Sequence, residues 1–429
     1  MRAARIALYG GGGAPYHHAA VLARGGHELS FVYPVDVREG ALAGFDAFVM
    51  PGGGYRAMQG QIDPLGAAGA RAIADYVRGG GMYLGSCAGS YDAAVVAESF
   101  VRACPAQREM CLLDARVWNE GDTEWLGLRS PGVGVLRSRT VASGHPVMAG
   151  MPERFEIAHY NGPFFRGGEE LALVEGPAER FTPAERFFGP FEGRTLVEEA
   201  AEVGVANVVA GACGRGRVVL FGSHPEFGFR LAMDDEQAPA RMLRNAVEWQ
   251  LEESGAPERP RVELFADRAA TEEDPERVAG LAERLRERCE ELRERPGRPR
   301  WLEPAYAMSV FGLSPGEVWR QGLDEIERLA GETAERAPHV EPGVLGMRPP
   351  AEWELDGGYH GVVPLLEQAD RLLADAGERW DADLGKPSPD AYAFALTSPY
   401  HLVAGSYLAA VGRVASAALL CSAYERVPA

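Results

Sequence analysis

Short apolar runs alternate with amphipathic segments over the first 100 residues. Four of these runs are typical of buried strands: 6–9, 28–33, 46–50 and 82–84. Apolar residues at helical spacing fill 15–25, and they do so again from Asp63-Pro64, an expected helix start, to Gly79. Strands that alternate with helices form parallel βαβ units, so this pattern predicts a doubly wound α/β sheet.

The next 150 residues are less regular. Short strand-like pieces occur at Trp118, 133–136 and 155–158. Two clearer strands, 205–209 and 217–221, flank the glycine-rich stretch 211–216 and are expected to form a hairpin. A helix over 239–251 then closes this part of the chain.

The pattern changes to helices alone after a linker at 253–260. Apolar residues at helical spacing occupy 278–292, 318–329, 365–373 and 402–424. Ser314 and Glu317 form a capping box, with Pro315 at the first helical position between them. We therefore expect an α/β domain over residues 1–255 and an all-helical domain over 261–429.

Composition and charge narrow the classes of partner. The formal net charge of −19 argues against nucleic acid or an anionic membrane as the main partner. The six cysteines form no CxxC pair, which is typical of reduced thiols in a cytoplasmic protein. The run 402–424 contains Arg413 and is expected to be a buried helix, not a membrane span.

Three glycine-rich turns follow three of the expected strands: Gly10–Gly13, Gly52–Gly54 and Gly85-x-Cys87-x-Gly89. The carboxyl ends of parallel strands meet at one edge of a sheet, so these turns are expected to share a pocket. A strand, a sharp turn bearing Cys87 and a helix form the layout of a nucleophile elbow. The sequence thus predicts that Cys87 is a nucleophile; the alternative is a buried, inert cysteine.

A base and its orienting acid follow another strand, at His224-Pro225-Glu226. His224 would accept the Cys87 proton and return it to the leaving group, and Glu226 would orient the imidazole. The alternative for His224 is a solvated turn residue.

Oxyanion donors would be backbone amides. We expect the amide of Ala88, after the nucleophile, to act with that of Gly53, next to Gly54. Asn161 is a candidate hydrogen-bonding residue for substrate, or else the start of an Asx turn before Gly162.

Three motifs in this order carry a family resemblance: Pro51-Gly52-Gly53, Gly85-x-Cys87-x-Gly89 and His224-Pro225-Glu226. Over about residues 4–252 the chain resembles the class I glutamine amidotransferase-like superfamily. The stretches 83–91 and 160–163 are most similar to the branch named after the N-terminal domain of biotin–protein ligases. The resemblance implies a flavodoxin-like αβα sandwich with a mostly parallel sheet, and a Cys-His-Glu triad that cleaves an amide through a thioester.

Two departures from the family bear on the substrate. Tyr91 stands four residues after the nucleophile, where glutaminases of this superfamily place a Gln that helps hold glutamine. Neither a synthetase domain nor a biotin ligase domain is evident in the sequence. We therefore expect a stand-alone amidase, peptidase or γ-glutamyl-type hydrolase acting on a small or peptidic amide, with Tyr91 at the substrate pocket.

Other functions stay open. The same triad could pass the acyl group to an amine, or the triad could be vestigial in a binding module whose helical domain contacts a partner or a second copy. A redox or glyoxalase-like enzyme would need a carboxylate in 10–16, which has none. We expect no cofactor, because Gly10–Gly13 does not match Gly-x-Gly-x-x-Gly. We expect no metal, because His17-His18 lacks ligand spacing and a carboxylate or Cys companion.

Overall fold

The computed structural model describes residues 2–53, 57–121, 127–186, 190–254, 259–265, 271–299, 302, 312–348, 360–382 and 399–425. The strands are β1 (Arg5–Tyr9), β2 (Glu28–Val32), β3 (Ala47–Met50), β4 (Met82–Ser86), β5 (Ala115–Val117), β6 (Gly132–Thr140), β7 (Arg154–Tyr160), β8 (Phe165–Gly167), β9 (Glu169–Pro183), β10 (Ala206–Cys213) and β11 (Gly216–Phe221). The helices are α1 (Tyr16–Arg24), α2 (Pro34–Arg38), α3 (Ala57–Arg78), α4 (Ala88–Ala93), α5 (Glu98–Ala103), α6 (Leu196–Val203), α7 (Ala240–Ser254), α9 (Pro275–Glu294), α11 (Pro315–Arg336), α12 (Pro342–Gly346), α13 (Val362–Glu378) and α14 (Pro399–Tyr424).

Five strands form a parallel half-sheet in the order β2-β1-β3-β4-β11. This is the flavodoxin-like strand order, so the predicted α/β class is confirmed. Alternate side chains enter two cores: Leu8 of β1 joins residues of α1 and α7, and Tyr9 joins residues of α2 and α3. Helices therefore cover both faces, and the strand ends that carry the glycine-rich turns share one edge.

The other half of the sheet is antiparallel and continues as β10-β9-β6-β7. In the described residues four strand pairings are parallel and six are antiparallel, so the sheet is mixed where we expected it to be mostly parallel. The long strand β9 escaped prediction because Gly176, Pro177 and several charged residues interrupt its alternation. Its pairing with β6 is correspondingly irregular, with two register shifts.

The start of the second predicted helix was also wrong. Asp63 and Pro64 lie inside α3, which begins at Ala57, and the break in α3 falls at Gly66 with φ 59° and ψ −176°. Glycine tolerates this backbone conformation, so the chain bends there and not at the proline.

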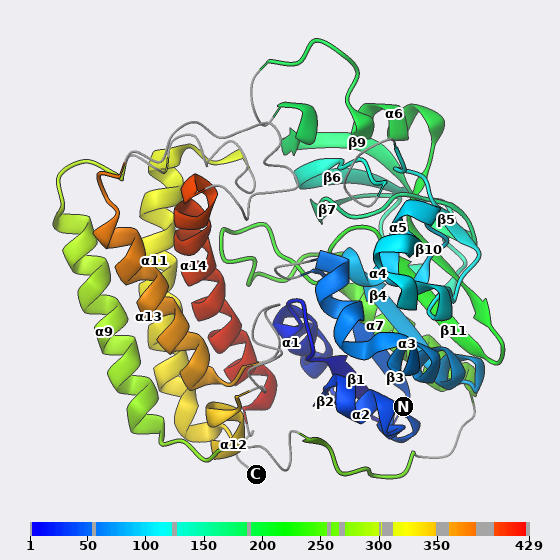
Figure 1. The fold of residues 1–429 in the computed structure, drawn as a ribbon, viewed down its shortest axis with the longest axis horizontal. Coiled ribbons are helices and arrows are strands. Elements are labelled where there is room, and N and C mark those ends of the chain that lie inside the picture. The colour runs from blue at the N-terminus through cyan, green and yellow to red at the C-terminus, as the bar shows by residue number, and fades with distance from the viewer. Residues whose placement is uncertain are drawn as a thin grey trace.

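Helices α9, α11, α13 and α14 form a bundle beside the sheet (Figure 1). We call this bundle, together with α12, the helical region, and residues 2–254 the α/β region. The interior of the bundle is apolar, and the ring centroid of Trp319 lies 4.9 Å from that of Tyr407 and 5.2 Å from that of Trp380. The predicted helical C-terminal part is therefore confirmed.

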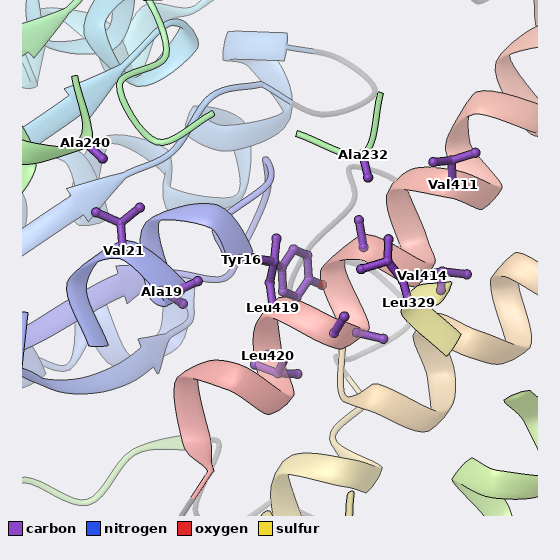
Figure 2. Close-up of a cluster of buried hydrophobic side chains, with 14 of the residues drawn as sticks. Tyr16, Ala19, Val21, Ala232, Ala240, Leu329, Val411, Val414, Leu419 and Leu420 are labelled. Atoms are coloured by element: carbon purple, nitrogen blue, oxygen red, sulfur yellow. The ribbon is translucent and has the colours of Figure 1, made fainter. Parts of the chain in front are cut away.

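The two regions share a continuous hydrophobic core where α14 packs against α1. Figure 2 shows Tyr16 and Ala19 of α1 facing Leu419 and Leu420 of α14. In the described residues Tyr407–Tyr424 is the one stretch apolar and long enough to cross a membrane, and 61 % of it is buried within the protein. A core helix passes the same test, and the contacts with α1 show that α14 packs as one.

Candidate active site

Cys87 lies between β4 and α4 in a rare backbone conformation, with φ 49° and ψ −109°. Its amide donates to the carbonyl of Phe221 on β11 at 2.8 Å. The Ser90 hydroxyl bonds the carbonyls of Gly85 and Phe221, both at 2.8 Å. Non-glycine residues hold such a conformation only where the surroundings impose it, and such residues cluster at functional sites.

The histidine and glutamate follow β11, at the same edge of the sheet as Cys87. The His224 amide donates to the carbonyl of Ala158 at 2.8 Å, which ties the turn to β7. His224 Nδ1 lies 2.7 Å from Glu226 Oε1. The ring stacks on Phe227 with centroids 4.2 Å apart and planes 2° apart. The imidazole is thus held at one nitrogen and on one face.

The charges of this group depend on each other. Burial alone would lower the pKa of His224, but Glu226 and Cys87 beside it raise this pKa to about 10. Burial alone would raise the pKa of Glu226, and His18 and His224 instead lower it to about 2. Both residues are 3 % exposed, so water screens these interactions little.

The thiol of Cys87 donates to the carbonyl of Tyr160 at 3.3 Å. Cys87 is close enough to His224 to help raise the pKa of the imidazole. The buried Nε2 of His224 makes no hydrogen bond to the described residues, so this nitrogen is left to exchange a proton with a substrate. The structure therefore brings Cys87, His224 and Glu226 together as the sequence predicts.

The first residues of the Gly52–Gly54 turn lie against the imidazole. A Cβ on Gly52 would lie 2.5 Å from His224 Cε1, so only glycine fits there. The Pro51 carbonyl accepts from the Gly89 amide at 3.3 Å and from Gln61 Nε2 at 2.8 Å. These bonds hold the turn beside α4, with Gly53 half-buried; Gly54 lies outside the described residues.

Ala88 is the first residue of α4, so helical bonding leaves its amide without a partner. Gly162 lies on the other side of the elbow, where a Cβ would lie 3.4 Å from the Cα of Cys87 and 1.7 Å from the carbonyl oxygen of Gly222. Backbone therefore surrounds Cys87 closely on several sides.

Tyr91 and Asn161 make mostly structural contacts. Tyr91 is 3 % exposed, its hydroxyl accepts from Asn119 Nδ2 at 2.8 Å, and it donates to the Asn161 carbonyl at 3.3 Å. Asn161 has φ 56°, and its Oδ1 accepts from the Gly132 amide at 3.1 Å. Both residues thus anchor the loop that carries the Tyr160 carbonyl.

His18 is a neighbour of the triad whose contacts the sequence did not predict. It comes from α1, is fully buried, and places Nε2 2.9 Å from Ser86 Oγ and 3.5 Å from Glu226 Oε2. Its neighbour His17 points elsewhere, toward the Ala232 carbonyl at 3.4 Å. Position after the first glycine-rich turn was the only sequence signal for either residue.

Within the described ranges no group of three or more His, Cys, Asp or Glu side chains is arranged to hold a metal ion.

A protein-family model described as "Biotin-protein ligase, N terminal" matches residues 42–103. This segment contains the Pro51–Gly53 turn and the Cys87 elbow. No curated protein matches the sequence.

A search of solved structures finds matches to part of this chain. A ThuA-like protein from Bacteroides uniformis is 13 % identical with a TM-score of 0.35, covering 59 % of this chain and 94 % of its own. A cytoplasmic protein from Salmonella typhimurium is 13 % identical with a TM-score of 0.36, covering 57 % and 98 %. PurLQS from Thermotoga maritima is 15 % identical with a TM-score of 0.34, covering 58 % and 99 %. At such low scores nothing about the site is transferred from these proteins.

Proposed function

We propose that this protein is a cysteine-dependent amidohydrolase of the class I glutamine amidotransferase-like superfamily, with its chemistry in residues 1–255. One observation carries the proposal: a cysteine with φ 49° lies at the sheet edge beside a buried His224–Glu226 pair. The family-model match over the elbow adds independent support.

In the first half of the reaction, His224, whose pKa is raised to about 10, already carries a proton on Nε2, and the Cys87 sulfur attacks the amide carbonyl carbon as a thiolate. Amides of Ala88 and Gly53 would stabilise the oxyanion. When the C–N bond breaks, the proton on His224 moves to the leaving nitrogen, which departs as an amine or ammonia. The acyl group remains on Cys87 as a thioester.

In the second half, His224 takes a proton from water, and the resulting hydroxide attacks the thioester carbon. The carboxylic acid leaves, the proton stays on His224, and the Cys87 thiolate is restored. Glu226 keeps Nδ1 protonated and stabilises the imidazolium in both halves. If an amine replaced water, the same thioester would yield a transferred amide.

The surroundings favour an amide other than free glutamine. Tyr91 stands at the glutamine-binding position of the resembled family, and its hydroxyl is already bonded to Asn119 and Asn161. A small or peptidic amide that approaches beside the Tyr160 loop fits this arrangement better.

The proposal is tested by ammonia or amine release from a panel of glutamine, γ-glutamyl conjugates, peptides and simple amides. We expect turnover of at least one amide other than glutamine, and Cys87→Ala should lower it by about a thousandfold or more while the protein stays folded. Full activity of the Cys87→Ala variant on a verified substrate would overturn the proposal.

A second measurement needs no substrate. Iodoacetamide labelling resolved by peptide mass should modify Cys87 well below pH 8. It should modify Cys87 faster than Cys111, whose thiol pKa is raised by partial desolvation at the surface and by Asp114. Equal labelling of the two would instead indicate a binding module with a vestigial triad.

A further inference from the structure

Glu226 lies between two imidazoles that come from opposite ends of the chain's α/β region. Its Oε1 is 2.7 Å from His224 Nδ1, and its Oε2 is 3.5 Å from His18 Nε2. His18 Nε2 also lies 2.9 Å from the hydroxyl of Ser86, the residue directly before Cys87. His18 therefore touches both the acid of the triad and the strand end that presents the nucleophile.

The tautomer of His18 follows from these neighbours. A lone pair on Nε2 would face a carboxylate oxygen and be repelled, so we assign the proton to Nε2. The buried Nδ1 has no hydrogen-bond partner among the described residues, in keeping with a deprotonated nitrogen there. The pKa of His18 is lowered by burial, so the ring is neutral at neutral pH.

We propose that His18 is a positioning residue of the triad: its Nε2–H group donates to Ser86 Oγ and lies 3.5 Å from Glu226 Oε2, a buried oxygen with no hydrogen-bond partner among the described residues. This inference rests on the proposed function. A neutral donor orients the carboxylate and stabilises its negative charge without adding a positive charge that would compete with His224. Glu226 then supports the imidazolium of His224 and, through it, the thiolate of Cys87.

Other titratable groups around the triad do not duplicate this role. The charges of Glu226 and Asp234 act on His17, but burial lowers the pKa of His17 to about 4, and Asp234 is paired with Arg328 at 2.6 Å. On the side of His224, burial lowers the pKa of His159 to about 3. Tyr91 and Tyr160 lie near Cys87 and are neutral phenols between pH 5 and 8.

The test compares His18→Phe, which removes the donor, with His18→Gln, which supplies an amide donor of similar reach. The readout is the pH dependence of iodoacetamide labelling at Cys87. We expect the labelling rate of Cys87 below pH 8 to fall about tenfold in His18→Phe and by less in His18→Gln. Ser86→Ala should cause a smaller decrease. His145→Phe, a half-buried histidine that packs on Trp249, is the matched control and should change nothing.

An unchanged profile in His18→Phe, or equal decreases in the Phe and Gln variants, would overturn the inference. If His18→Phe does not fold, the inference is tested with His18→Gln and Ser86→Ala. Labelling profiles of both variants identical to that of the unmodified protein would overturn the inference. Failure of the proposed function looks different, because Cys87 of the unmodified protein would then label with the pH dependence of an ordinary thiol.

Discussion

The α/β region and the helical region bury their polar groups in different ways. In the α/β region, ionisable side chains such as His18, His224 and Glu226 are buried together and contact one another. In the helical region, buried Thr333 bonds the Leu329 carbonyl one turn earlier, and Ser416 does the same with Gly412. The first arrangement concentrates charge at the edge of the sheet. The second satisfies polar groups within a helix, apart from the buried carboxylate of Glu325 on α11, which pairs with Arg230.

This contrast indicates that the two regions have different roles. Buried ionisable groups cost stability, and they persist where their interactions have a use. The helical region contributes packing against α1 and ion pairs to the segment after Glu226, where Arg230 meets Glu325 and Arg328 meets Asp234, both at 2.6 Å. The helical region therefore stabilises the segment next to the site without contributing a triad residue. The following predictions test this difference between the two regions.

The largest effect is expected where the two regions meet. Leu420 of α14 is fully buried in the shared core, and Leu420→Ala should lower the free energy of unfolding by about 2–5 kcal/mol. Urea unfolding followed by circular dichroism should still show one transition. Leu372→Ala, at a partly buried site on α13, should cost clearly less. Two separated transitions would contradict a shared core.

Acid should destabilise the α/β region through its buried neutral histidines. Burial lowers the pKa of His17 to about 4 and of His159 to about 3, so below pH 6.5 the unfolded chain binds more protons. Each group then removes about 1.4 kcal/mol of stability per pH unit as the pH falls. The raised pKa of His224 affects stability on the alkaline side. The stabilisation of the folded protein by protonated His224 is complete below pH 6.5 and is lost as the pH rises toward 10.

The variant that checks this is His159→Phe, compared by urea unfolding at a series of pH values between 4.5 and 6.5. The slope of the unfolding free energy against pH should decrease, relative to the unmodified protein, by the amount that corresponds to about one bound proton. An identical slope would show that His159 does not titrate in this way.

A smaller effect is expected at the ion pairs between the regions. Arg328→Met removes the partner of Asp234 and should cost about 1 kcal/mol, because Arg328 is partly exposed and water screens the pair. Hydrogen exchange should quicken in residues 224–237. Arg328→Lys keeps the charge and should cost less; equal exchange in both variants and the unmodified protein would argue against support of this segment by α11.

The smallest effect is expected on the outer surface of the helical region. Arg286 on α9 is exposed and pairs with Glu283 and Glu290 of its own helix. Arg286→Ala should leave the urea midpoint and Cys87 labelling unchanged within error, since exposed pairs contribute little. A marked loss of labelling would mean that this surface influences the site.

Much of the site could be predicted because its signals are local. A strand, a glycine-flanked turn and a helix predict the elbow at Cys87, and the same reasoning places His224 and Glu226 at the end of β11. The contacts of Tyr91 and Asn161 could not be predicted, since Asn119 and Gly132, their partners, lie far away in sequence. His18 was considered as a residue that follows the first glycine-rich turn and as half of a metal pair, but nothing in its local sequence indicates Glu226.

The sequence by itself determined the parallel half-sheet, the elbow and the helical character of the C-terminal part, because apolar periodicity and glycine positions act over a few neighbouring residues. Only the tertiary structure decided the antiparallel half of the sheet, since β9 carries no regular alternation. It also decided that α14 packs on α1 and that His18 of α1 reaches Glu226. Such contacts join residues about 200 or more positions apart, and they depend on how complete elements pack together.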